Sequence, residues 1–471
     1  MSSVQSGSYD FDVVVIGAGP GGYPAAIRAA QLGARTAIVE REAWGGTCLN
    51  WGCIPTKAMI ASAELAWQAR HGESLGIVAP GLSVNYRALL EHKQATVRKL
   101  SQGVQSLLKA NGVDTIEGQA SLVSADRVHV HGPSGDRWLR VRRVIIATGS
   151  TSSFPPGVPT HARIVESRAF LDLPELPARL LVLGGGYIGC ELAAMAAMLG
   201  SQVTIVELLD DILLLLDDDA RSVVRKSLER TLGVRILTRR PAESIEAGDS
   251  GVRLRVGGET LEGDVLLVAT GRQPMTEGLC PDRAGLQLDP KGYIRTDARN
   301  RTSVPGIYAI GDVNGGPQLA HAATSQGLIA AEDACGKSPR PNESLVPGVI
   351  FTHPEVAVVG VTERDAAQRG LTVKVGRFPY AALGRALAAG DRDGFVKWIA
   401  EADTGRLVGA CAVGARATDL ISEAALAIRA ELTAHEVGRT IHPHPTFGEL
   451  WMEAAHVLEG APVHIPPSRK K

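Results

Sequence analysis

Two apolar runs along the chain have the pattern of buried parallel strands, and both end in glycine-rich turns. They are FDVVVI at 11–16 and RLLVL at 179–183, and each is followed by a segment of helical length and a second apolar run. This order predicts two strand–turn–helix–strand units at separate places in the chain. The glycines of the two turns are Gly17, Gly19, Gly22, Gly184, Gly186 and Gly189.

An acidic residue closes each unit at the same distance from its first glycine. Glu40 ends the run RTAIVE and Glu207 ends QVTIVE, in both cases 23 residues after the first glycine. In a dinucleotide site the first glycine forms a tight turn, the second lets the backbone approach a pyrophosphate, and the third lets the helix pack on the strand. The acid accepts a hydrogen bond from a ribose 2′-hydroxyl, and helix N-terminal amides hold the phosphates. The matched spacing therefore predicts two dinucleotide sites.

The surroundings of the first unit predict that it binds FAD. A cysteine pair follows this unit, and far downstream VPGIYAIGDVNGG (304–316) places Gly311 and Asp312 after a short apolar run. A carboxylate in that place is suited to hydrogen-bond a polyol such as the ribityl chain of a flavin.

The residues after Glu207 predict that the second unit binds NAD rather than NADP. Leu208 and Leu209 follow the acid directly, and no arginine occurs before Arg221. A 2′-phosphate would therefore meet a carboxylate without a nearby cation.

Two similar segments flank the second unit. VIIATGS (144–150) and LLVATGRQP (266–274) both have the pattern of a strand that enters a turn, so they are expected to be the exit from the first domain and the return to it. The glycines of these turns, Gly149 and Gly271, are expected to line the FAD and NAD sites respectively. The predicted domains are 1–150 and 275–345 for FAD, 151–274 for NAD inserted between them, and 346–471 as a separate unit.

The last predicted domain, 346–471, lacks the strand–turn–helix–strand pattern of the first two. Short runs such as EVAVVGV (355–361) and GFVKWIA (394–400) come first, and a helical stretch at 419–439 follows, so we expect an α+β domain with an antiparallel sheet. It ends in TIHPHPTFGELWMEAA (440–455). The sequence of this segment by itself favours a turn and a helix cap, with Thr446 as N-cap and Glu449 at the third helical position of a capping box, and it leaves a functional role of the two histidines open.

The stretch GGTCLNWGCIPTK at 45–57 places two cysteines, Cys48 and Cys53, beside a predicted helix. Pro55 suits the first turn of that helix, so Cys53 lies near a helix N-terminus, where the dipole favours a thiolate. Lys57 lies one turn further on, where a cation can stabilise a thiolate or a reduced flavin. A redox-active pair is the preferred interpretation. A structural staple or a zinc site stays open, although the loop is short and no clustered ligands accompany the pair.

Composition excludes several other classes. The 471 residues are enough for about three domains, and 45% hydrophobic with 21% charged residues is typical of a soluble globular protein. A net charge of −1 provides no basic field for nucleic acid. The chain shows no leader pattern and no apolar run long enough for a membrane span, so we expect a cytoplasmic protein without a membrane partner.

The cysteine motif, both glycine-rich units, AIGDV and HPHPTFGE together resemble the class I pyridine nucleotide-disulfide oxidoreductases, in order and over essentially the whole chain. The resemblance is strongest to the branch that oxidises dihydrolipoyl groups to lipoyl groups and reduces NAD. It implies an α/β fold with two Rossmann-like domains and a C-terminal dimerisation domain, in a two-fold homodimer whose active sites combine both subunits. It also implies a lipoylated protein and the acyltransferase core of a 2-oxo acid dehydrogenase complex as partners.

The same resemblance implies roles for individual residues. Cys48 would exchange with the substrate, and Cys53 would contact the flavin. His444 would be the base, with Glu449 as its orienting carboxylate, and both would come from the partner subunit. The other matched positions are Lys57 and Glu191, paired beside the flavin, and Tyr187, which can cover the nicotinamide pocket.

This chain lacks residues that are typical of enzymes with related activities. Glutathione-type reductases need NADPH-binding arginines after the second strand of the nucleotide domain, and mercuric reductase carries a cysteine pair at its C-terminus, whereas this chain ends in VHIPPSRKK. Transhydrogenases of the family lack the redox cysteines. A non-catalytic subunit that uses the cysteines only as a redox sensor is the remaining alternative, and no metal site is expected.

Overall fold

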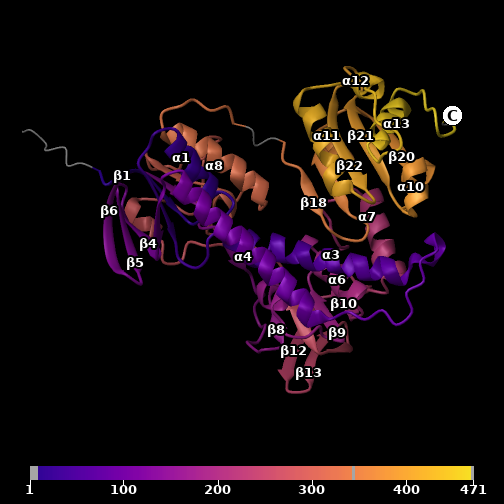
Figure 1. The fold of residues 1–471 in the computed structure, drawn as a ribbon, viewed down its shortest axis with the longest axis horizontal. Helices are drawn as coiled ribbons and strands as arrows, with labels where there is room; N and C mark the ends of the chain where they lie inside the picture. The colour runs from indigo at the N-terminus through magenta and orange to yellow at the C-terminus, as the bar shows by residue number, and fades with distance from the viewer. Residues whose placement is uncertain (1–8, 342–344, 468–471) are drawn as a thin grey trace, which may run out of the picture. The chain divides into compact units, whose positions relative to one another are not determined.

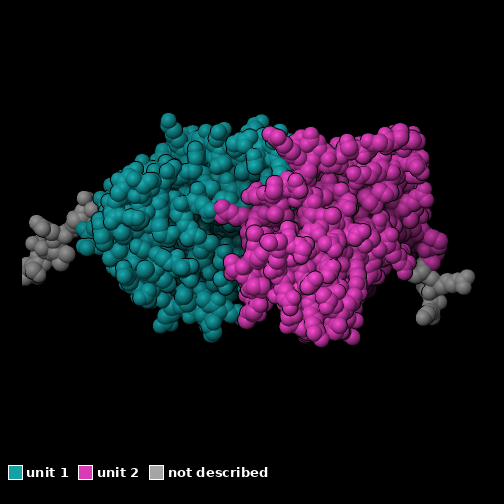
Figure 2. Space-filling view, turned by 90° about the horizontal axis from the view of Figure 1, so that it is seen from below, with its two compact units in different colours: residues 1–58, 90–153, 271–343 teal, residues 59–89, 154–270, 344–471 magenta. Residues whose placement is uncertain are grey.

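The computed structural model describes residues 9–341 and 345–467, and the chain divides into two compact units (Figure 2). Each unit contains one of the two glycine-rich turns. Unit 1 comprises residues 1–58, 90–153 and 271–343, and unit 2 comprises residues 59–89, 154–270 and 344–471.

Unit 1 is built on a sheet whose central strand is β1 (Phe11–Ile16). β1 pairs in parallel with β2 (Thr36–Glu40) on one side and with β6 (Gly135–Ile146) on the other. Both faces of β1 are covered, which explains why its sequence is almost continuously apolar. The sheet order is β3-β2-β1-β6-β5-β4, with β17 (Ile307–Ala309) parallel to β6; β3 is Asp114–Glu117, β4 is Gln119–Ser124 and β5 is Arg127–Gly132.

Two alanine-rich helices, α1 (Gly22–Gln31) and α8 (Ala320–Ala334), lie side by side in unit 1 (Figure 1). Small residues permit this close approach, since a side chain on Gly327 would overlap the carbonyl oxygen of Gly21. The fully buried alanines of α1 belong to the same core cluster as Val13 and Val15 of β1. The helix therefore begins at the glycine turn and is held against the strand that leads into it.

Unit 2 contains a second parallel sheet, in the order β11-β10-β9-β15-β8. β9 (Arg179–Leu183) leads into the second glycine turn, α6 (Tyr187–Leu199) follows, and β10 (Gln202–Val206) returns parallel to β9. The two Rossmann-like units predicted from the glycine spacing are therefore confirmed. The other elements here are β8 (Ile164–Val165), α7 (Asp218–Lys226), β11 (Arg235–Leu237), β15 (Val265–Val268), and a three-stranded antiparallel sheet of β12 (Ala242–Gly248), β13 (Gly251–Val256) and β14 (Glu259–Gly263).

The C-terminal part of unit 2 is the predicted α+β arrangement, with an antiparallel sheet in the order β18-β19-β22-β21-β20. Its core includes Trp398 and Trp451, whose rings lie 4.6 Å apart. The elements are β18 (Gly348–Ile350), β19 (Val356–Gly360), β20 (Val373–Pro379), β21 (Phe395–Glu401), β22 (Leu407–Val413), α9 (Glu363–Gln368), α10 (Gly384–Ala389), α11 (Ala417–Arg429), α12 (Ala434–Arg439) and α13 (Glu449–Leu458).

The helical stretch predicted at 419–439 is two helices, and this corrects the sequence-based expectation. α11 ends at Arg429, and Glu431 adopts a left-handed backbone conformation with φ of 56°. α12 then begins with a capping box in which Thr433 and Glu436 satisfy each other's backbone N–H groups. The turn between them places the Leu432 carbonyl where it accepts a hydrogen bond from Leu407 N at 2.9 Å.

The segments that were expected to join the first domain to the inserted one pair with each other. β7 (Ser150–Ser152) and β16 (Arg272–Pro274) form a two-stranded antiparallel ladder within unit 1. The remaining helices are α2 (Gly46–Trp51), α3 (Cys53–Arg70), α4 (Tyr86–Ala110) and α5 (Ser167–Leu171). In the described part of the chain, no helix has the length and apolar character required to cross a bilayer.

A buried lysine connects the start of α7 to the C-terminal sheet within unit 2. The Lys397 side chain on β21 is 1% exposed, and its Nζ lies 3.0 Å from an oxygen of Asp217, 3.0 Å from Asp219 and 2.6 Å from Glu363. Among the residues described, these three carboxylates are the one group arranged closely enough to hold a metal ion, and the ammonium group already lies among them. We therefore assign them as counter-ions of Lys397.

Replacing Lys397 with methionine is expected to destabilise the protein by about 3 kcal/mol, because three carboxylates would be left without their buried counter-ion. Burial is the largest single influence on Asp217 and opposes its ionisation, but the hydrogen bond and charge of Lys397, together with the backbone N–H groups of Glu363 and Arg364, outweigh burial and lower the pKa of this carboxyl. Stability from a lowered pKa is present above the ordinary pKa and is lost as the pH falls through the folded-state value. Urea unfolding should therefore show a smaller difference between the two proteins below about pH 4 than at pH 7.

Lys374→Met, at an exposed position on the neighbouring strand β20, is the matched control and should change stability by less than about 0.5 kcal/mol. Equal effects of the two substitutions at pH 7 would contradict the role given to the buried cluster.

Candidate active site

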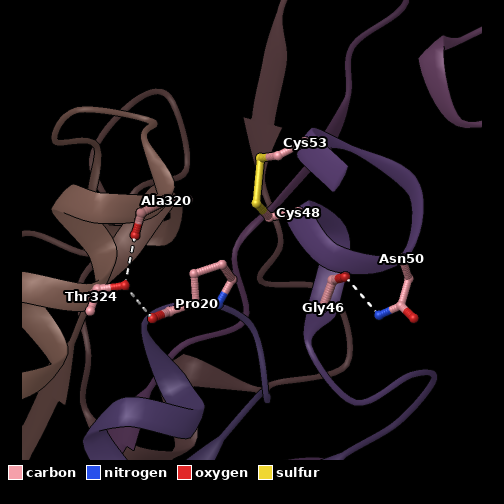
Figure 3. Close-up of a disulfide and its surroundings, with 7 residues drawn as sticks. All are labelled: Pro20, Gly46, Cys48, Asn50, Cys53, Ala320 and Thr324. Atoms are coloured by element: carbon pink, nitrogen blue, oxygen red, sulfur yellow. Dashed lines mark hydrogen bonds between the residues drawn. A yellow bond between two sulfur atoms is a disulfide. The ribbon is translucent and has the colours of Figure 1, made fainter. Parts of the chain in front are cut away.

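Cys48 and Cys53 form a disulfide between the short helix α2 and the first residue of α3 (Figure 3). Their Cα atoms are 4.6 Å apart, and both residues are partly exposed. Cys53 opens an 18-residue helix, so the helix dipole favours its thiolate once the bond is reduced. Pro55 lies in the first turn, as predicted. Cys53 can therefore leave as a stabilised thiolate, and the partly exposed disulfide is accessible to an attacking thiol.

The cysteine segment is attached directly to the first glycine turn. Gly45 N donates a hydrogen bond to the carbonyl of Ala18 at 3.0 Å. Gly46 has φ of 60°, and a Cβ there would lie 2.6 Å from Cα of Gly19, so only glycine fits. Asn50 closes the segment by donating from Nδ2 to the carbonyl of Gly46 at 2.9 Å (Figure 3). The disulfide and the turn predicted to hold a pyrophosphate are thus parts of one local structure.

The first glycine turn has the shape that a dinucleotide requires. A side chain on Gly17 would overlap Ala147 O, and one on Gly22 would overlap Gly17 O, whereas a Cβ on Gly19 would have its nearest atom 4.0 Å away. The first and third glycines therefore permit tight packing, and the second leaves open space. This division is the one predicted for the approach of a pyrophosphate.

The predicted ribose acceptor, Glu40, stands at the end of β2 beside a cavity of about 840 Å³. Its Oε2 accepts a hydrogen bond from Ala18 N at 2.8 Å, and its Oε1 accepts one from Glu42 N at 2.8 Å. The carboxylate is therefore fixed by the backbone and retains further acceptor positions. The wall of the cavity includes Trp44 and His131, and the space suits the nucleoside end of an extended dinucleotide.

Asp312 is held by residues that sequence reasoning missed. It accepts a hydrogen bond from Ser150 Oγ, and Arg272 Nε donates to the same hydroxyl at 2.7 Å. The neighbouring Gly311 N donates to Gln326 Oε1 at 2.6 Å. Ser150 and Arg272 end the two ATGS and ATGR segments, so their likeness in sequence was the available signal.

Helix α8 is joined to the first glycine turn by one hydroxyl. Thr324 Oγ1 lies 2.8 Å from the carbonyl oxygen of Pro20 and 3.1 Å from that of Ala320, the first residue of α8 (Figure 3). The glycine turn, the cysteine segment and the start of α8 are therefore fixed relative to one another inside unit 1.

The second glycine turn, in unit 2, repeats the geometry of the first. A Cβ on Gly184 would lie 2.5 Å from Ala269 O and one on Gly189 would overlap Gly184 O, whereas a Cβ on Gly186 would meet no described atom within 4 Å. Glu207 Oε2 accepts a hydrogen bond from Gly185 N at 2.6 Å, as Glu40 does from Ala18 N. The two glycine turns are thus alike in the hydrogen bonding of their acids as well as in their residue spacing.

Two arginines lie closer to Glu207 in space than the sequence suggested. Arg240 N donates to the carbonyl of Glu207 at 3.1 Å, and Arg239 N donates to that of Leu209 at 2.9 Å. They follow β11, which pairs in parallel with β10, so the carboxyl ends of the two strands coincide. The Arg239 side chain is paired with Asp210 at 3.0 Å. The sequence between Glu207 and Arg221 therefore does not reveal the cations that the adjacent strand brings near Glu207.

Glu191 and Tyr187 both lie in α6. Glu191 in α6 is 5% exposed, and its Oε1 accepts a hydrogen bond from Phe351 N at 2.8 Å. Tyr187 is the first residue of α6 and is partly exposed. The pairing of Lys57 with Glu191 and the covering role of Tyr187 stay predictions.

His444 and Glu449 form a hydrogen-bonded pair at the start of α13. His444 Nδ1 lies 2.9 Å from Glu449 Oε1, and the imidazole is 78% exposed. Burial opposes ionisation of Glu449, but hydrogen bonds from His444 and from Thr446 N outweigh it and lower the pKa of the carboxyl. A carboxylate at Nδ1 keeps the proton on that nitrogen, which leaves Nε2 to accept one.

The capping box predicted for this segment is only half present. Glu449 accepts from Thr446 N, but α13 begins at Glu449 itself with Gly448 as N-cap. The Thr446 hydroxyl instead donates to the carbonyl of Pro443 at 2.7 Å. Glu449 is therefore the first residue of the helix rather than the third, and it faces His444.

Comparison with known families decides the class of the molecule. Residues 11–327 match the model of the pyridine nucleotide-disulphide oxidoreductases, and residues 346–455 match their dimerisation domain. The chain belongs to the pyridine nucleotide-disulphide oxidoreductase family. Its members use FAD together with NAD(H), which agrees with the cofactors expected for the two glycine turns and with the open space at Gly19 and Gly186.

Individual members of the family are similar to this chain over nearly their whole lengths. It is 43% identical over 463 residues to dihydrolipoyl dehydrogenase of Chlamydia muridarum, covering 98% of this chain and 99% of that one. It is 42% identical to dihydrolipoyl dehydrogenase of Bacillus subtilis, covering 96% and 97%. Among solved structures, LpdA of Mycobacterium tuberculosis is 30% identical with a TM-score of 0.89 over 94% and 99%. RclA of Escherichia coli, an HOCl-induced flavoprotein disulfide reductase, is 31% identical with a TM-score of 0.85 over 93% and 98%.

Gly186→Ala is expected to leave the fold and FAD content of this oxidoreductase unchanged but to weaken NADH binding by about tenfold, equivalent to about 1.4 kcal/mol. Its φ of −73° suits alanine, and the added methyl group would fill the open space at the turn. Gly189→Ala is the contrasting variant, because its Cβ would overlap Gly184 O and should lower the melting temperature. Unchanged NADH affinity in a folded Gly186→Ala protein would contradict the assignment of this turn.

Proposed function

We propose that this protein is a dihydrolipoyl dehydrogenase, which oxidises the dithiol of dihydrolipoyl groups to the cyclic disulfide and reduces NAD⁺. The observation that carries the proposal is the Cys48–Cys53 disulfide, placed at a helix N-terminus and attached to the first dinucleotide turn. Relatives that are 42% and 43% identical over nearly the whole chain carry the same name.

The thiol chemistry is assigned to four residues. His444 Nε2 removes the proton from a substrate thiol while Glu449 holds Nδ1–H, because a thiolate is the attacking species. The substrate thiolate attacks Cys48 Sγ, and the bond to Cys53 breaks with Cys53 leaving as a thiolate. The second substrate thiol then attacks the substrate sulfur of the mixed disulfide, which closes the lipoyl ring; Cys48 leaves as a thiolate and takes up the proton that this second thiol releases. The substrate loses two electrons and two protons, and the cysteine pair gains the electrons.

The cofactors would be held by the two glycine turns. When bound, FAD supplies a two-electron carrier between the cysteine pair and NAD⁺. For FAD, the chain provides the first turn with Glu40, the Asp312 network and the open turn at Gly149, where a Cβ would meet no described atom within 4 Å. For NAD, it provides the second turn with Glu207 and the similarly open Gly271. Cys53 is assigned to contact the flavin, Lys57 and Glu191 are assigned as a pair beside it, and Tyr187 is assigned to cover the nicotinamide pocket.

The preference for NAD over NADP rests on charge near Glu207. Both carboxylate oxygens of Glu207 accept backbone hydrogen bonds, Asp210 neutralises Arg239, and the Arg240 guanidinium lies beside Gly257 and acts on Glu259, so this side of the turn offers little attraction to a 2′-phosphate. Glutathione-type reduction with NADPH is correspondingly less well supported.

The assembly is proposed to be a two-fold homodimer. Residues 346–455 match a dimerisation domain and include His444 and Glu449, so we assign these two residues to the active site of the partner subunit. Lipoylated carrier proteins and the acyltransferase core of a 2-oxo acid dehydrogenase complex are the proposed partners, in the cytoplasm. The division at residues 150, 274 and 345 is retained as the proposed domain organisation.

The direct experiment mixes the FAD-loaded protein with dihydrolipoamide and NAD⁺ and follows NADH formation. We expect NAD⁺ to exceed NADP⁺ in kcat/KM by about 100-fold, equivalent to about 2.8 kcal/mol, because a 2′-phosphate would meet the Glu207 carboxylate where a ribose hydroxyl can donate a hydrogen bond to it. Oxidised glutathione with NADPH is the control reaction. Faster turnover in that control would favour the glutathione-type alternative.

Cys48→Ser is expected to abolish dihydrolipoamide turnover, a loss of more than about 1,000-fold, because no sulfur remains to form the mixed disulfide. FAD should stay bound, since the hydrogen bonds that hold the turn involve backbone atoms and Asn50. Cys411→Ser, at a buried cysteine in β22, is the matched control and should retain turnover. Normal turnover by Cys48→Ser would remove the disulfide from the mechanism.

A further inference from the structure

A second histidine, two residues before His444, has an environment unlike that of an ordinary surface histidine. The His442 side chain is 6% exposed. Its Nδ1 lies 2.9 Å from the carbonyl oxygen of Thr440, and its Nε2 lies 2.8 Å from Glu423 Oε1 on α11. Both ring nitrogens therefore have a partner supplied by this chain.

The partners of His442 define its protonation. A carbonyl oxygen and a carboxylate oxygen only accept hydrogen bonds, so each ring nitrogen must donate, and an imidazole that donates from both nitrogens is an imidazolium. The hydrogen bond to Glu423 raises the pKa of His442, and burial opposes this effect only in part. The geometry places a positive charge inside the segment that carries His444.

This charge lies beside the His444–Glu449 pair. A Cβ on Gly448 would be 3.7 Å from His442 Cδ2, and Gly448 directly precedes Glu449. The field of His442 also contributes to the lowered pKa of Glu449, after the larger influences of burial, His444 and Thr446. The titratable groups that act on His442 are Glu423 on α11 and Glu449 on α13, and His444 is the other partner of Glu449.

We propose that His442 is a positioning residue for the thiol reaction, a fixed cation that keeps Glu449 ionised and makes His444 release its proton at lower pH. The inference rests on the proposed function, because it assigns a purpose to His442 only if His444 is the base. A like charge nearby disfavours the protonated form of an imidazole. A base in its unprotonated form is the one that can deprotonate a thiol.

The test replaces His442 with glutamine, which can hydrogen-bond without a charge. The pH profile of kcat/KM for dihydrolipoamide should have its acid limb moved to higher pH by about 0.5 unit or more, because a neighbouring cation has been removed. His442→Lys, which returns a positive charge within reach of Glu423, should move the limb back. His435→Gln is the matched control, since His435 pairs with Glu459 at 3.1 Å at an exposed position. An unmoved acid limb in His442→Gln, or an equal shift in His435→Gln, would overturn the proposal.

A second measurement does not depend on turnover. In protein labelled at histidine Cε1, the resonances of His442 and His444 can be assigned with His442→Gln and His444→Gln and followed by NMR as the pH is raised. His442 should stay protonated at pH values where His435 has titrated, and His444 should titrate at higher pH in His442→Gln than in the wild type. Simultaneous titration of His442 and His435 would overturn the proposal even if His442→Gln failed to fold.

The two proposals can fail separately. Absence of NADH formation from dihydrolipoamide by the wild-type protein would contradict the proposed function while the NMR titrations still report on His442. Normal turnover with an unchanged acid limb in His442→Gln would contradict only the role of His442.

Discussion

The contact between the cysteine segment and the first glycine turn is the constraint on which the redox site depends. Gly45 N bonds to Ala18 O, and Gly46 packs against Gly19 with no space for a side chain. A disulfide exchanges electrons with a flavin only if the two are held at short range, and here the same backbone that is shaped for a dinucleotide also carries Cys48. The position of the cysteine segment relative to the first glycine turn is therefore set by main-chain packing rather than by side-chain rotamers.

The two nucleotide units show how far an arrangement of this kind follows from sequence. The spacing from glycine to acid predicted both turns, both helices and both acids, because tight turns and close packing demand glycine at fixed positions. The cysteine pair and the terminal histidine were singled out because their neighbours formed specific motifs, and the structure shows a Cys48–Cys53 disulfide and a His444–Glu449 hydrogen bond at these places. The structure adds that Glu40 and Glu207 bind equivalent backbone N–H groups, which the pattern alone did not reveal.

The functional residues that the sequence did not reveal were missed for one physical reason, which is strand pairing. Arg239 reaches the region of Glu207 through strand pairing, and Ser150 meets Arg272 through the β7–β16 ladder across 122 positions. Periodicity describes neighbours along one element and contains no information about which strands adjoin. The break between α11 and α12 is different, because the sequence does contain its signal: Thr433 and Glu436 have the spacing of a capping box.

Carboxylates assigned to function are fixed in this chain mainly by backbone donors. Glu40 binds Ala18 N, Glu207 binds Gly185 N, and Glu449 binds Thr446 N, with Glu191 similarly bound to Phe351 N. A backbone N–H is placed by the fold and has no rotamers, so each carboxylate keeps one orientation without a flexible cationic partner. Its remaining lone pairs stay directed at whatever occupies the site, a ribose hydroxyl or an imidazole. The polypeptide thus orients the carboxylates assigned to function with the same hydrogen bonds that define its turns and helix starts.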